Sequence, residues 1–330
     1  MVEVQVRDVD RLAGALIFIT AFIGLVANAF IAIHIRHLAL LRNSFGRLLQ
    51  LQAVGDSIFG AIWAIYFAPV LIFNIKALQD IQVAARFGQL CLICYDISIY
   101  SHLIISLNRF VSVYMPTRYN IIFTEKFTSI LVGCTALGSF LFSFFLVYVK
   151  CQMCFSVQRW MLDYEVPPCN PTFVYYAEFV RGLVIICAFA VLNACTFIRM
   201  IFYNKAKQRK QITVAFDTVQ HAKRRSVEKT FVQQVTLQGM LYVLELTTYF
   251  YVANYFPVAA TDVAHDPNRW PNFLLTTYAW ILVHTLDGVI TLVFNKQLRH
   301  AMRRLFTFYR KGASGSKTLS RGSNVEKTRA

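Results

Sequence analysis

The sequence predicts an all-α membrane protein in which seven transmembrane helices form one bundle. Hydrophobic residues make up 57% of the 330 residues and charged residues only 15%, against roughly 25% charged residues in soluble domains. Seven apolar stretches each supply the roughly 20 residues that a helix needs to cross a bilayer. A helix satisfies its own backbone hydrogen bonds, so such stretches are stable as helices in hydrocarbon. The stretches cover residues 12–35, 48–73, 88–114, 128–149, 172–202, 230–256 and 272–294.

The basic residues predict the orientation of this bundle. Most of the 33 lysines and arginines follow the first, third, fifth and seventh stretches. Cytoplasmic loops are enriched in Lys and Arg, so the N-terminus is predicted outside and the C-terminus inside. The net charge of +16 could also indicate a nucleic-acid surface. The basic residues flank apolar stretches, however, which favours a lipid membrane as partner and no nucleic acid.

The two ends of the chain flank a single membrane domain, residues 12–308. Residues 1–11 are predicted to form a short extracellular N-terminus, and the first stretch is expected to remain as a signal anchor. Residues 295–308 place apolar side chains at helical spacing among arginines. This pattern predicts an amphipathic helix on the inner membrane face, with a continuation of the seventh helix as the alternative. Residues 309–330, rich in Gly, Ser, Lys and Arg, are predicted to be disordered.

Three predicted helices carry a polar residue near the middle or in the cytoplasmic half of the span. These residues are Asn28 in the first helix, Asp56 in the second and Asp287 in the seventh. Carboxylates at this depth need partners. We expect the three residues to share a water, a proton or a sodium ion near Asp56, and no other cofactor. A static polar clamp between the three helices is the alternative.

Further polar and aromatic residues lie toward the outer half of the third, fifth, sixth and seventh stretches. Asp96 precedes Arg109 by a helical rise of about 20 Å, which places it near the middle of the membrane. Glu178 and Arg181 are three residues apart and can pair on one helix face, a contact that can also be purely structural. The candidates for a ligand pocket are Tyr95, Asp96, Glu178, Glu245, Tyr249, Trp280 and His284.

The long loop after the fourth stretch contains three cysteines, of which only two can pair. The predicted topology places this loop in an oxidising compartment, where a disulfide is stable. We favour a bridge between Cys154 and Cys169, which would enclose Trp160. A bridge between Cys151 and Cys169 is the alternative.

The sequence lacks the patterns typical of enzymes. It contains no His/Cys/Asp cluster at metal-ligand spacing, no phosphate-binding Gly loop and no nucleophile elbow. We therefore expect no catalytic residues and no metal site.

The polar residues resemble those of the seven-helix G protein-coupled receptors over nearly the whole chain. Gly24 and Asn28 match the first-helix motif of these receptors, and Leu51 with Asp56 matches the second-helix motif. The segment 108–110 stands where rhodopsin-like receptors carry Asp-Arg-Tyr. The segment 287–291 stands where they carry Asn-Pro-x-x-Tyr, and Asn295 keeps the spacing into an eighth helix. The resemblance implies a rhodopsin-like architecture with a short eighth helix.

Four blocks narrow this resemblance to the nematode serpentine chemoreceptors of class X, the Srx family. They are residues 43–57, 100–110, 116–124 and 287–299. The resemblance implies a chemosensory receptor in the plasma membrane, in sensory neurons on the cilium. It implies an odorant or pheromone-like small molecule as ligand and a heterotrimeric G protein as partner. A receptor dimer is compatible with it.

The resemblance also implies roles for single residues. Arg109, with Asn108 and Phe110, would contact the G protein or lock the inactive bundle, although Asn108 cannot form the usual Asp–Arg lock. Asn28, Asp56 and Asp287 would form a polar switch with Thr291 and Asn295. Thr291 replaces the tyrosine that swings in other receptors.

A secondary transporter or proton carrier that uses the buried carboxylates is the alternative function. It predicts a flux that is lost in Asp56→Asn and requires no G protein. The sequence shows no internal repeat, which many transporters have. A ligand-gated channel would need a sustained polar stripe along a span, and no stretch carries one.

Overall fold

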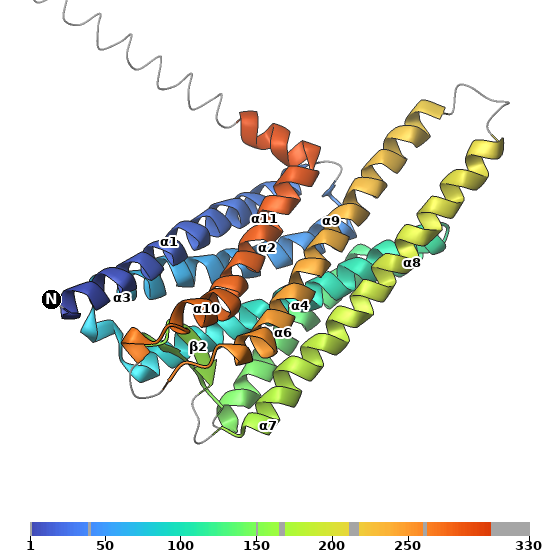
Figure 1. The fold of residues 1–330 in the computed structure, drawn as a ribbon. Helices are drawn as coiled ribbons and strands as arrows, with labels where there is room; N and C mark the ends of the chain where they lie inside the picture. The colour runs from blue at the N-terminus through green and yellow to red at the C-terminus, as the bar shows by residue number, and fades with distance from the viewer. Residues whose placement is uncertain are drawn as a thin grey trace, which may run out of the picture.

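The computed structural model describes residues 2–38, 41–149, 151–164, 169–210, 218–259 and 263–304, and it leaves the side chains of 2–7, 203–229, 231 and 232 undescribed. Long helices lie side by side in one bundle (Figure 1). The crossings are α1 (Val2–His34), α2 (Ser44–Ile62) with α3 (Ala68–Phe73), α4 (Ile81–Tyr114), α6 (Glu125–Tyr148), α7 (Pro171–Val174) with α8 (Arg181–Lys210), α9 (Thr218–Phe250), and α10 (Arg269–Phe273) with α11 (Ala279–Phe294). We call the end that holds Asp8 the N-terminal end and the opposite end the C-terminal end.

In the part of the chain that the structure describes, three of the helices that cross the bundle contain a π-helical turn, and all three turns belong to the N-terminal half. They are η3 (Trp63–Phe67), η5 (Tyr175–Val180) and η8 (Leu274–Tyr278). Each π turn inserts an extra residue, so the side chains beyond it are rotated by about 100° around the helix axis. The shorter helical turns are η1 (Ile35–His37), η4 (Lys76–Leu78), α5 (Tyr119–Ile122), η6 (Val252–Tyr255) and η7 (Val263–His265).

Local sequence signals begin and end several of these helices. The side chains of Asn43, Asp80 and Thr124 accept hydrogen bonds from backbone amides in the first turns of α2, α4 and α6. Such caps satisfy donors that have no partner within the helix. Asn74 adopts a left-handed conformation with φ of 50° and ends α3, because asparagine tolerates this region better than most residues.

A β-hairpin covers the N-terminal end of the bundle. Strand β1 (Met153–Ser156) pairs antiparallel with β2 (Met161–Tyr164), and Met153 lies opposite Tyr164. The hairpin lies so close to α4 that a Cβ atom on Gly88 would approach the Met153 carbonyl oxygen to 2.1 Å. Only glycine allows this approach.

The first helix is longer than the sequence predicts. It begins at Val2 rather than at residue 12, so residues 2–11, the predicted extracellular segment, continue the same helix. Asp10 accounts for part of this extension, since its Oδ1 accepts hydrogen bonds from Arg269 at 2.7 Å and from the Trp160 indole at 2.8 Å. These contacts hold the first turns of α1 against the hairpin and α10.

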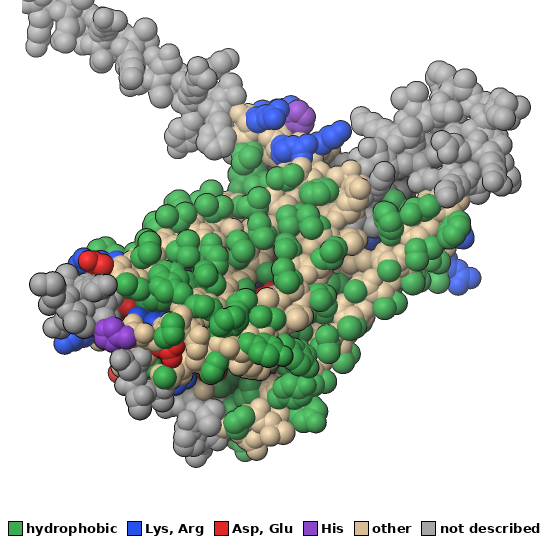
Figure 2. All heavy atoms as spheres, viewed as in Figure 1, with side chains coloured by type: hydrophobic (Ala, Val, Ile, Leu, Met, Phe, Trp, Pro, Cys, Tyr) green, Lys and Arg blue, Asp and Glu red, His purple; other side chains and the backbone are tan. Residues whose placement is uncertain are grey.

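The outer surface of the bundle is apolar, as a membrane protein requires. Figure 2 shows hydrophobic side chains over the length of the helices, with charged side chains at the two ends of the bundle. Soluble proteins rarely expose apolar patches of this extent. Among the described residues, six helices are long and apolar enough to cross a membrane. The remaining crossing, α9, is more polar because it carries Gln234, Gln238 and Glu245, which are all buried inside the bundle.

A further helix follows α11 at the C-terminal end. Residues 296–304 are helical and turn away from the axis of α11 (Figure 1). Leu298 is fully buried against the bundle, whereas Arg303 and Arg304 are exposed. This segment is therefore amphipathic and separate from α11. The rest of the predicted amphipathic helix, 305–308, and the predicted disordered tail, 309–330, lie outside the described residues.

Candidate functional site

A cavity lies beneath the hairpin, between α4, α9 and α11. Its volume is about 110 Å³. Five of the seven predicted pocket residues line it. Spacing within single helices could not establish that residues from different helices meet at one cavity. The walls consist of Leu92, Tyr95, Met153, Asp163, Tyr164, Val174, Glu178, Glu245, Leu246, Tyr249, Phe250 and Trp280.

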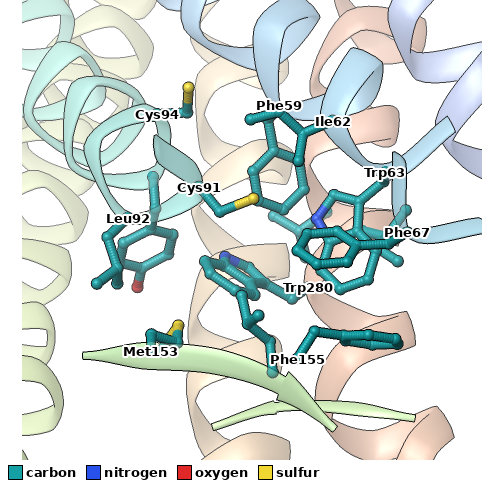
Figure 3. Close-up of a cluster of buried hydrophobic side chains, with 14 of the residues drawn as sticks. Phe59, Ile62, Trp63, Phe67, Cys91, Leu92, Cys94, Met153, Phe155 and Trp280 are labelled. Carbon is teal, nitrogen blue, oxygen red and sulfur yellow. The ribbon is translucent and has the colours of Figure 1, made fainter. Parts of the chain in front are cut away.

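The hairpin closes this cavity and is bonded to the helices around it. Leu162 donates its amide hydrogen to the Thr277 hydroxyl at 3.2 Å and accepts a hydrogen bond from the Tyr249 hydroxyl at 3.1 Å. In Figure 3, Met153 and Phe155 lie on the hairpin below Trp280, and Cys91 and Leu92 lie on α4. The ring centroid of Phe155 is 4.8 Å from that of Phe67 and 5.6 Å from that of Trp63. Burial raises the pKa of Asp163, the hairpin carboxyl group in the cavity wall.

Asp96, a predicted pocket residue, does not line the cavity. The guanidinium of Arg181 forms ion pairs with Asp96 at 2.8 Å and with Glu178 at 3.2 Å. The same group donates a hydrogen bond to the Tyr100 hydroxyl oxygen at 2.9 Å and lies over the ring of Phe142 at 4.0 Å from its centroid. The structure thus turns Asp96 toward α8 and away from a ligand, because a buried carboxylate binds the nearest available cation.

His284, another predicted pocket residue, belongs to the polar interior below the cavity. Its Nδ1 is 2.7 Å from Asp56 Oδ1, and both side chains are buried. Asn28 donates a hydrogen bond to the backbone oxygen of His284 at 3.1 Å. A Cβ atom on Gly288 would approach the Asn28 side chain to 2.6 Å, so this glycine allows α1 and α11 to meet. Asn28 and Asp56 therefore meet at His284.

Asp287 is the centre of a second buried network. Its Oδ2 accepts hydrogen bonds at 3.0 Å from Gln52 on α2, His102 on α4 and Tyr242 on α9. Tyr242 also contacts the Ser98 hydroxyl at 2.7 Å. One carboxylate oxygen thereby joins four helices. Within the described residues, Asp56 contacts His284, whereas Asp287 contacts Gln52, His102 and Tyr242.

Thr291 and Asn295, the other predicted switch residues, have different surroundings. The Thr291 hydroxyl accepts hydrogen bonds from Gln234 at 2.9 Å and from Gln238 at 3.2 Å, and thus joins α11 to α9. Asn295 instead caps the terminal helix, because its Oδ1 accepts from the amides of Gln297 and Leu298. The structure gives Asn295 a capping position rather than a place in either network.

The segment 108–110 lies at the C-terminal end of α4. Asn108 donates a hydrogen bond to the hydroxyl of Tyr119 at 3.2 Å. The guanidinium of Arg109 lies 3.7 Å from the ring centroid of Phe45 on α2, a favourable cation–π geometry. Phe110 stacks on Tyr114 at 4.3 Å. Arg109 therefore bridges α4 and α2 at the end of the bundle opposite the cavity.

The disulfide joins Cys151 to Cys169, with a Cα–Cα distance of 4.6 Å. The favoured pairing of Cys154 with Cys169 is wrong. Cys154 lies within β1 opposite Asp163, and successive strand residues point to opposite faces. Its sulfur points toward the backbone oxygen of Ile81 at 4.0 Å, on α4. Only Cys151, before the strand, can approach Cys169.

Replacing Cys151 with serine is expected to lower the stability of the protein by about 3 kcal/mol, because the bridge closes a loop across 18 residues of sequence. Thermal unfolding in lipid nanodiscs measures the effect. The matched control is Cys154→Ser, which retains the bridge and is expected to unfold close to the parent temperature. An equal loss in both variants would contradict the observed pairing.

The sequence did not indicate most partners of the two networks. Gln52, His102, Gln234, Gln238 and Tyr242 are all at most 2% exposed. Polar side chains within apolar spans are costly unless partnered. His102 and the four-residue spacing of Gln234 and Gln238 could therefore have indicated buried polar contacts from the sequence. Their partners lie on other helices and could not be read from spacing.

Comparison with known proteins places this architecture in a family. Residues 18–295 match the family described as "Serpentine type 7TM GPCR chemoreceptor Srx". Serpentine receptor class X 45 of Caenorhabditis elegans is 61% identical over 92% of this chain and 84% of its own length. Serpentine receptor class X-43 of the same nematode is 23% identical over 90% and 88%.

The solved structures give the same fold. Squid rhodopsin superposes with a TM-score of 0.62 at 13% identity, over 92% of this chain and 87% of its own. The arrangement of seven helices is thus that of a G protein-coupled receptor, and the sequence match over most of the chain is to one receptor class. The protein belongs to the Srx family of serpentine seven-transmembrane receptors.

Proposed function

We propose that this receptor binds a small extracellular molecule in the cavity beneath the hairpin and activates a heterotrimeric G protein at the C-terminal end. The observation that carries the proposal is the cavity itself, which combines aromatic walls with buried carboxyl groups. Pockets for small ligands have this composition. The charge distribution supports an orientation with the N-terminal end outside the cell. Membership of a chemoreceptor family supports a place in the plasma membrane, on the cilium of a sensory neuron.

A continuous set of contacts links the cavity to the interior below it. The Trp280 ring lies edge-on to Tyr95 at 5.7 Å, and Tyr95 lies 6.4 Å from Tyr242. Tyr242 donates its hydroxyl hydrogen to Asp287, and Gln238 donates to the Asp287 backbone oxygen at 3.1 Å. A ligand that moves Trp280 or Tyr95 would favour one packing of α9 against α11. This shift would open a G protein site around Arg109.

Replacing Arg109 with alanine is expected to abolish ligand-stimulated guanine-nucleotide exchange, because Arg109 lies at the end of α4 that the G protein would approach. Exchange on purified G proteins is measured in membranes that carry the chain, under pools of small odorants and pheromone extracts. The control is Arg86→Ala, an exposed arginine at the opposite end of the same helix. Exchange that persists in Arg109→Ala at equal surface expression would contradict this role.

A proton carrier is the second candidate, favoured by two buried His–Asp contacts, His284 with Asp56 and His102 with Asp287. A histidine nitrogen faces the carboxylate of Asp56, which favours a proton over a sodium ion at that site, since sodium prefers oxygen ligands. Proton flux into proteoliposomes that is lost in Asp56→Asn would support this candidate. Exchange without flux would exclude it.

A further inference from the structure

Glu245 on α9 carries a carboxyl group that the described residues leave without a partner. The side chain lines the cavity and is 5% exposed. Its Oε2 is buried and forms no hydrogen bond with the residues that the structure describes. Burial of an ionised carboxylate is strongly unfavourable unless a cation or several donors accompany it. The cavity wall therefore has a position at which a positive charge would be stabilised.

The other acidic groups near the cavity already have a cation. Arg181 pairs with both Asp96 and Glu178, at 2.8 Å and 3.2 Å, and Arg181 itself does not line the cavity. Asp163 has Arg159 as its favourable electrostatic neighbour. Glu245 differs from these groups, because no basic side chain of the described residues pairs with it. A cationic ligand would supply the positive charge that these described residues do not.

The walls around Glu245 suit a cation with an apolar body. Tyr95, Tyr249, Phe250 and Trp280 line the same cavity. Aromatic faces attract ammonium groups, most strongly where water is excluded. The volume of about 110 Å³ is somewhat below that of an engineered cavity of about 150 Å³ that holds benzene. The occupant is therefore small.

We propose that the cavity binds a small protonated amine, with the ammonium group at Glu245 and the apolar part against Tyr95, Tyr249 and Trp280. An anion would face the Glu245 carboxylate, which no basic side chain of the described residues accompanies. A neutral molecule would bring no positive charge to the Glu245 carboxylate. The proposal rests on the proposed function, since it assigns the ligand class of the same cavity, but binding of the amine is measured without a G protein.

Three compounds with one carbon skeleton separate charge from shape. They are isoamylamine, isoamyl alcohol and isovaleric acid, which at pH 7 are a cation, a neutral molecule and an anion. Binding to the full chain in phosphatidylcholine nanodiscs is measured by calorimetry and by the shift of the unfolding temperature. We expect the amine to bind at least about ten-fold more tightly than the alcohol, as a charge-assisted hydrogen bond provides. The acid is expected not to bind.

The deciding variant is Glu245→Gln, which keeps the shape of the side chain and removes its charge. We expect it to lose about ten-fold or more in affinity for the amine, to keep its affinity for the alcohol, and to unfold at or above the parent temperature because a buried charge is removed. The control is Glu125→Gln, at the C-terminal end, where Glu125 is exposed and pairs with Arg47 at 3.2 Å. It is expected to bind the amine as the parent does.

The outcomes separate this proposal from the proposed function. Amine binding that depends on Glu245, without nucleotide exchange, would support the ligand class and refute the coupling. Exchange driven by neutral compounds and unchanged in Glu245→Gln would support the receptor function and overturn the amine proposal. Equal binding of amine and alcohol to the parent chain, or binding of neither, would also overturn it.

Discussion

Replacing Asp287 with alanine is expected to destabilise the bundle by about 3–5 kcal/mol. The substitution leaves three buried donors, from Gln52, His102 and Tyr242, without the oxygen that they share at 3.0 Å. Each buried donor without a partner costs about 1–3 kcal/mol, and breaking a buried charged network costs a similar total. The measurements are thermal unfolding in nanodiscs and the fraction of chain that reaches the cell surface.

Two control variants test whether the loss of stability comes from the missing acceptor oxygen. Asp287→Asn retains an acceptor oxygen, so its loss of stability is expected to be less than half that of the alanine variant. Ser57→Ala removes an exposed hydroxyl whose hydrogen bond, within the described residues, goes to the Val54 backbone oxygen of its own helix at 2.9 Å, and it is expected to change stability by less than about 0.5 kcal/mol. An alanine variant as stable as Ser57→Ala would refute a structural role of the Asp287 network.

Replacing Arg181 with methionine is expected to destabilise the N-terminal half of the bundle by about 3–5 kcal/mol. The substitution keeps most of the side-chain length against Phe142 but leaves Asp96 and Glu178, both buried, without their cation. Loss of one partner from a buried ion pair has this magnitude because the remaining charge is uncompensated. Thermal unfolding in nanodiscs at pH 7 measures it.

The triple variant Asp96→Asn, Glu178→Gln, Arg181→Met tests the electrostatic cause. Removal of all three charges is expected to recover at least half of the stability that Arg181→Met loses, since replacing a whole buried ion cluster is often neutral. A triple variant as unstable as the single one would show that the lost contacts with Phe142 and Tyr100, rather than the charges, account for the effect.

The sequence determined the seven apolar spans, the sorting of basic residues to one end and the receptor class. These features depend on local composition and spacing, because a span must satisfy its own backbone in hydrocarbon. The sequence also indicated Tyr95, Glu178, Glu245, Tyr249 and Trp280, since polar and aromatic residues within spans are exceptional. The structure places these five around one cavity.

The tertiary structure alone decided the partners of these residues. Helical spacing predicts contacts three or four residues apart, whereas Asp56 with His284 and Gln52 with Asp287 are separated by more than two hundred residues. The π turns η3, η5 and η8 change the faces that α2, α8 and α11 present, and apolar periodicity does not reveal them.

Helix and strand packing also decided the disulfide pairing and the charge partners of the buried carboxyl groups. Because side chains alternate in direction along β1, Cys154 points toward α4, and the disulfide forms between Cys151 and Cys169. The position of Arg181 neutralises Asp96 and Glu178, whereas no basic side chain among the described residues pairs with Glu245. The sequence supplied the acidic residues of the outer half, but only the packing of α4, α8 and α9 determined which of them faces the cavity with its charge unmet, because a single arginine can reach only the carboxylates within its length.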